Sequence, residues 1–168
     1  IGMRKKSTML QVEGNENYKY YLYNIFFKVF LALLYAFIYI YIYKGGDTMY
    51  YWKGAECLNN LFWDSPSNYL SEMLSTPTDY SQYINFNVKT GIPPIWIYRD
   101  PNSFFISKLL SIMMLVFGQS YLVLTMILAY ISSIASWKVY ELVRSYKFTS
   151  DWLGALSILF IPSISFWC

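Results

Sequence analysis

The chain has 168 residues, of which 56% are hydrophobic, 21% aromatic and only 14% charged. In soluble domains roughly a quarter of the residues are charged, so this composition excludes an ordinary water-soluble domain. The high hydrophobic content also excludes a disordered chain. A formal net charge of +3 without any histidine excludes a histidine metal site and leaves too little positive charge for a nucleic-acid partner. Two cysteines, Cys57 and Cys168, predict neither a disulfide framework nor a zinc site. We expect no cofactor, with a divalent metal left open.

Three apolar runs are long enough to predict membrane spans, because a bilayer core of about 30 Å needs about 20 helical residues. These runs are residues 25–43, 119–143 and 152–168. Lys28, near the start of the first run, is expected to extend toward the inner surface. Because the chain begins with Ile1 and stops at Cys168 inside the third run, we expect the N-terminal part of a longer protein with a truncated last span. The predicted fold class is an all-α integral membrane protein with about three transmembrane helices.

A fourth apolar run, residues 103–117, is about one turn short of a span and contains Lys108. If it crossed the membrane, the basic stretch around Arg144 would lie outside, against the positive-inside rule. A surface position for this run instead places that stretch on the cytoplasmic side together with the basic N-terminus. We therefore predict an inner (cytoplasmic) membrane protein with its N-terminus in the cytoplasm, and a fourth span remains the alternative. Outside the spans, the predicted parts are a cytoplasmic tail (1–24), an extracytoplasmic loop (44–118) and a cytoplasmic loop (144–151).

The long loop is expected to contain two juxtamembrane surface helices. Gly45 and Gly46 follow the first span, where glycine takes the left-handed conformation that ends a helix. In the next segment, 48–62, apolar residues recur every three or four positions, which is typical of a helix lying on a surface. The second helix is 103–117, and the proline-containing stretch between the two helices predicts only short pieces of structure.

Asp47 is the candidate catalytic residue. It lies at the outer end of the first predicted span, between the two glycines and the first surface helix. A carboxylate held at the membrane face can accept a proton from an attacking hydroxyl. The alternative is that Asp47 only caps the helix, accepting hydrogen bonds from the Met49 and Tyr50 amides.

Arg99, Asp100 and Lys108 are the candidate substrate-binding residues. Arginine binds phosphate through two hydrogen bonds, and the neighbouring Trp96 or Tyr98 can stack on a sugar. Lys108 in the second surface helix can meet a lipid phosphate. The alternatives are an interfacial arginine beside a turn aspartate, and a lysine that extends to the membrane surface.

The order of these parts resembles the N-terminal part of polytopic GT-C-type glycosyltransferases, which use polyprenyl-phosphate sugars. The matching features are a span ending in Gly45-Gly46-Asp47-Thr48, a surface helix, a proline-containing loop, a short helix ending in Phe117-Gly118, a span ending in basic residues, and a span ending in Pro162-Ser163-Ile164-Ser165-Phe166-Trp167.

The resemblance implies an inverting transferase that moves a sugar from a polyprenyl-phosphate donor to an extracytoplasmic acceptor. It assigns the general base to Asp47 and gives the lipid-linked sugar and membrane lipid as partners. Family members often carry a second acid beside the first, whereas Thr48 stands there in this chain. The alternative function is that of a non-enzymatic polytopic membrane protein, either a transporter subunit or a polysaccharide-export scaffold.

The predicted topology has a direct test by cysteine labelling of intact cells. A cysteine at Ser145 and a cysteine at Ser7 should both resist an impermeant maleimide, because both lie in the cytoplasm. Labelling at Ser145 with none at Ser7 would instead establish that residues 103–117 cross the membrane.

Overall fold

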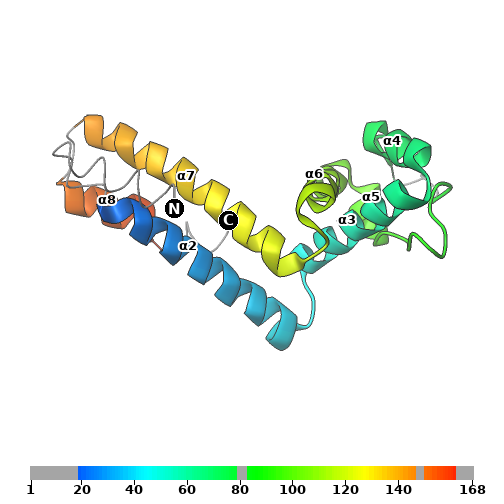
Figure 1. Ribbon diagram of the computed structural model, residues 1–168, viewed down its shortest axis with the longest axis horizontal. Helices are drawn as coiled ribbons and strands as arrows, with labels where there is room; N and C mark the ends of the chain where they lie inside the picture. Colours follow the sequence, from blue (N-terminus) through cyan, green and yellow to red (C-terminus); the bar gives the residue numbers. More distant parts are fainter. Residues whose placement is uncertain (1–18, 79–82, 147–149, 162–168) are drawn as a thin grey trace. The chain divides into compact units, whose positions relative to one another are not determined.

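The computed structural model describes residues 19–78, 83–146 and 150–161, and this part of the chain is helical without any strand (Figure 1). The helices are α2 (Lys19–Phe37), the π-helix η2 (Ile38–Tyr43), α3 (Asp47–Asp64), α4 (Pro66–Leu74), α5 (Ile95–Arg99), α6 (Pro101–Phe117), α7 (Tyr121–Ser145) and α8 (Asp151–Leu159). The prediction of an all-helical fold is confirmed for the described residues. The chain forms two compact units, which we call the terminal unit (1–37 and 125–168) and the central unit (38–124).

Two helices are long and apolar enough to cross a membrane. They comprise 24 residues, Tyr20–Tyr43, and 25 residues, Tyr121–Ser145. At about 1.5 Å per residue, each is longer than the roughly 30 Å core of a bilayer. The first two predicted spans therefore coincide with candidate membrane helices.

The third predicted span is described only in part. Helix α8 has nine residues, Asp151–Leu159, and residues 162–168 lie outside the described part of the chain, as does most of the predicted tail. A count of three spans therefore stays a prediction.

Polar contacts join α2 to α7 within the terminal unit. The Asn24 Nδ2 donates to the carbonyl of Ser133 at 2.9 Å, and the Lys28 Nζ donates to the Ser132 hydroxyl at 3.0 Å. Lys28 is only 1% exposed, so the expectation that it extends to the inner surface is wrong. A hydroxyl on a neighbouring helix satisfies the ammonium without a path to the membrane surface. The two contacts fix α2 and α7 in antiparallel orientation (Figure 1).

The core of the central unit lies where α3 meets α4, α5 and α6. Its buried residues are Cys57, Leu58, Leu61, Tyr69, Phe86, Ile97, Tyr98 and Phe104. Helix α3 covers the predicted surface helix 48–62, and α6 covers the predicted helix 103–117. The apolar side of α3 packs on protein, because Ala55 and Leu58 are fully buried.

Gly54 sets how closely α3 and α6 approach each other. A Cβ at this position would lie 2.7 Å from the Ser107 Oγ and 3.2 Å from its Cβ. The Ser107 hydroxyl in turn donates to the carbonyl of Tyr51, one turn earlier on α3. Glycine therefore leaves the space that Ser107 occupies, and a side chain larger than a methyl group would force α3 and α6 apart.

The stretch between the two surface helices contains more structure than the sequence predicts. Helix α4 begins at Pro66 with Ser65 as its N-cap, and α5 is a single short turn of helix after Pro94. Serine before proline is a common start of a helix, because proline lacks the amide proton that the first turn leaves unbonded. That signal was present in the sequence and identifies α4.

Substitutions at Gly54 test the close approach of α3 and α6. Gly54→Ala should change stability little, because the gain in helix propensity of about 1 kcal/mol offsets the crowding against Ser107. Gly54→Leu should lower the free energy of unfolding by about 1–3 kcal/mol through overpacking. Urea titration in detergent, followed by tryptophan fluorescence, measures both, and equal stability of the two variants would contradict the contact.

Candidate functional site

The connection between η2 and α3 takes a conformation that glycine favours. Gly45 and Gly46 have φ values of 156° and 122°, and Lys44 has a φ of 51°. A Cβ at Gly46 would collide with the ring of Tyr39. The left-handed ending expected from the two glycines is thus observed, and it places Asp47 in the first turn of a new helix.

Asp47 is exposed and has no capping role. The N-cap of α3 is Gly46, whose carbonyl accepts from the Tyr50 amide at 3.1 Å, and no side chain caps this end of the helix. The prediction that Asp47 accepts hydrogen bonds from the Met49 and Tyr50 amides is therefore wrong. The reason is that Asp47 is already the first residue of the helix, one position past the N-cap from which a side chain accepts such bonds.

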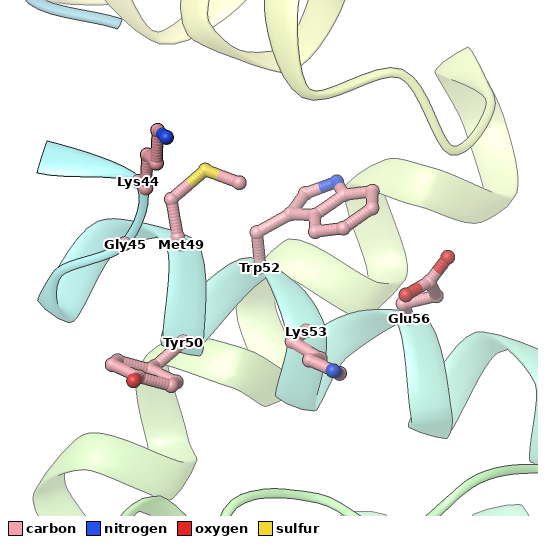
Figure 2. A pocket seen from close by; sticks show the side chains of 7 residues that line it. All are labelled: Lys44, Gly45, Met49, Tyr50, Trp52, Lys53 and Glu56. Atoms are coloured by element: carbon pink, nitrogen blue, oxygen red, sulfur yellow. The ribbon is translucent and has the colours of Figure 1, made fainter. Parts of the chain in front are cut away.

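A hollow of about 310 Å³ lies along the first turns of α3, and Asp47, the first residue of this helix, is not among the side chains that line it (Figure 2). It is lined by Lys44, Gly45, Met49, Tyr50, Trp52, Lys53 and Glu56. Two ammonium groups and two aromatic rings thus surround one cavity, with a single carboxylate. Cations bind phosphate and aromatic rings stack on sugars, so this set of side chains suits a phosphorylated sugar.

Aromatic contacts join this hollow to α5. Trp96 packs edge-on against Tyr50 at a centroid distance of 5.4 Å and against Tyr51 at 6.2 Å. On the other side, Trp52 packs edge-on against Tyr121. Trp96 remains exposed, as the sugar-stacking prediction requires, whereas Tyr98 is buried and does not reach a ligand.

Asp100 is the N-cap of α6. Its carboxylate accepts from the amides of Asn102 and Ser103 and from the Ser103 hydroxyl. The Ser103 hydrogen bonds lower the pKa of this carboxyl below its usual range. The structure thus gives Asp100 a role in starting α6, and its expected role in substrate binding has no geometric support.

Lys108 points into the central unit and not toward a lipid headgroup. It is 8% exposed, and its Nζ donates to the carbonyls of Met73 at 3.1 Å and Ser75 at 2.6 Å. These carbonyls lie at the C-terminal end of α4, where a helix leaves acceptors unbonded. Burial lowers the pKa of Lys108, and the nearby Glu72 carboxylate opposes that shift. Its predicted binding of lipid phosphate conflicts with this position.

Glu72 is the buried charge that the sequence did not reveal. Its carboxylate accepts from Asn85 Nδ2 at 2.7 Å, from the Tyr98 hydroxyl at 3.3 Å and from the Ser75 hydroxyl at 3.3 Å. Burial, with Glu72 close by, raises the pKa of Tyr98 to about 12. Because these partners are up to 26 residues away in the chain, no local pattern indicates them.

Arg99 is the predicted binding residue whose role the structure leaves open. It ends α5, and its buried Nε has no hydrogen-bond partner among the described residues. Its charge lies near Tyr83, where it opposes the rise in pKa that burial gives that phenol. Arg99 and Asp100 are neighbours at the junction of α5 and α6, whereas no hydrogen bond or ion pair in the described ranges joins Asp47 to the other three predicted site residues.

Comparison of the chain with protein-family models, curated proteins and solved structures found no match. Within the described ranges, no group of three or more cysteine, aspartate or glutamate side chains is placed to hold a metal ion.

Replacing Lys108 tests whether it supports the fold. Lys108→Met leaves two carbonyls of α4 unbonded and a buried Glu72 without its nearby cation. The free energy of unfolding should fall by about 1.5–3 kcal/mol, the usual range for hydrogen bonds to a charged group. Lys89→Met, at an exposed position of the same unit, is the matched control and should be neutral. Equal urea midpoints for the two variants would overturn the structural role.

Proposed function

We propose that this chain is part of a membrane glycosyltransferase that moves a sugar from a polyprenyl-phosphate donor to an extracytoplasmic acceptor. The observation that carries the proposal is a hollow with two cations and two aromatic rings along the first turns of α3, the helix that begins with the exposed Asp47 carboxylate. These features lie at the end of a helix that has the length and composition of a membrane span. A lipid-linked donor would present its phosphate at this level.

In the proposed reaction, Asp47 accepts the proton of the acceptor hydroxyl while that oxygen attacks the anomeric carbon. The bond from this carbon to the phosphate oxygen breaks, and the polyprenyl phosphate leaves with the bonding pair. Lys44 and Lys53 would stabilise the charge on the phosphate, in place of the predicted Asp100 and Lys108. Tyr50, Trp52 and Trp96 would position the sugar ring.

The second candidate is a non-enzymatic membrane protein. Its support is that Asp100 and Lys108, two of the four residues predicted to form the site, have structural roles. In that case the hollow would bind no sugar donor, and the negative charge of Asp47 would only interact favourably with the positive end of the α3 dipole. The two candidates differ in what a change of Asp47 does to activity.

Asp47 variants of the full-length protein distinguish the candidates. Asp47→Asn and Asp47→Ala should both accumulate like the parent, because the side chain makes no capping bond. Both should lose transfer from a polyprenyl-phosphate sugar by roughly a hundredfold or more, since proton abstraction contributes about 10²–10⁴.

Asp64→Asn is the control, because Asp64 is an exposed carboxylate at the other end of α3. The amide oxygen of the asparagine can still accept the hydrogen bond that Asn87 donates to Asp64. It should keep parental turnover. An Asp47→Asn variant with parental turnover would contradict the catalytic role.

A further inference from the structure

Helix α6 has its polar side chains inside the central unit and its apolar side chains outside. Its buried residues are Phe104, Ser107, Lys108, Ser111 and Met114. Its exposed residues from position 105 onward are Phe105, Ile106, Leu109, Ile112, Val116 and Phe117. Three of the five buried residues are polar and all six exposed residues are apolar, which reverses the pattern of a helix that faces water.

The polar groups inside are hydrogen-bonded. The Ser107 hydroxyl donates to the Tyr51 carbonyl at 3.1 Å, and the Ser111 hydroxyl donates to the Tyr69 hydroxyl at 3.4 Å. Lys108 donates to the two carbonyls at the end of α4. From position 105 onward, the helix thus satisfies its polar side chains against protein and leaves none of them exposed, as a lipid-facing helix must.

Chain connectivity identifies the surroundings of that outer side. Only residues 118–120 separate α6 from the candidate span α7, and only residues 44–46 separate the other candidate span from α3. Three extended residues reach about 11 Å at most. If these two helices cross a bilayer, the start of α3 and the end of α6 are both held at its surface.

We propose that the outer side of α6 is buried in the lipid of the membrane surface, with Leu109, Ile112 and Val116 in the acyl region. The central unit then docks on the bilayer through a helix about 26 Å long that lies along the surface. This proposal rests on the membrane insertion of α2–η2 and α7, and it does not depend on the transferase chemistry. No exposed residue of α6 from position 105 onward is charged, and a helix side that faced water would carry charged or polar side chains. Lipid therefore fits this side better than water.

Site-specific fluorescence in vesicles tests the proposal. The parent is the full-length protein with Cys57→Ala and Cys168→Ala, reconstituted into phosphatidylcholine and phosphatidylglycerol vesicles. Single cysteines at Leu109, Ile112 or Val116 carry an environment-sensitive nitrobenzoxadiazole label. The controls are Val88→Cys, an exposed position of the same unit, and Phe30→Cys, an exposed position of α2.

The three α6 labels should emit at shorter wavelength than the Val88 label and should be quenched by doxyl-labelled lipid to an extent similar to the Phe30 label. Quenching by aqueous iodide, or protection from both quenchers, would overturn the proposal in favour of water or of a protein partner. If the Phe30 label also escapes the lipid quencher, membrane insertion fails together with this proposal. The results at the three α6 positions do not bear on the Asp47 assay, so this proposal can fail while the proposed function stands; a loss of membrane insertion at Phe30 would contradict both.

Discussion

The close contact of α3 and α6 at Gly54 is the constraint on which the rest of the central unit depends. With no side chain at Gly54, the Ser107 hydroxyl reaches the backbone of α3. The next residue of α6, Lys108, then reaches the carbonyls at the end of α4. A larger residue at position 54 would separate the helices and take the Lys108 ammonium away from its carbonyl partners.

Most polar side chains in this unit therefore serve the fold. Asp100 starts α6, Lys108 ends α4, and Glu72 holds Asn85 and Tyr98. A buried charge is costly unless it is bonded, and each of these side chains has its partners inside the unit. The exposed charges around the start of α3 have no such role in the fold. Asp47 belongs to that set because it is neither buried nor bonded as a cap.

The helical class, the two candidate spans and helices α3 and α6 could be predicted from the sequence. A bilayer demands a long apolar run and a packed helix demands apolar residues at regular spacing, so both elements leave a local pattern. The glycine connection and the start of α6 at Pro101 also followed from local rules. The partners of Lys108 could not be predicted, since they lie 33 and 35 residues away in the chain.

For the candidate site, Asp47 was predicted, whereas the hollow along the first turns of α3 was not. Lys53 and Glu56 are typical of the solvent side of a helix, and only the fold places them with Lys44 and Trp52 around one cavity.

The α3–α6 contact that fixes this fold is the claim to test first. Cysteines at Gly54 and Ser107, in a parent lacking Cys57 and Cys168, place two Cβ atoms about 3.2 Å apart, near the disulfide range of about 3.5–4.5 Å. After mild oxidation and proteolysis at Lys89, this pair should keep the two fragments joined, while a control pair at Gly54 and Ile112, on the outer side of α6, should let them separate. Separation of the Gly54–Ser107 fragments would contradict the contact and the arrangement built on it.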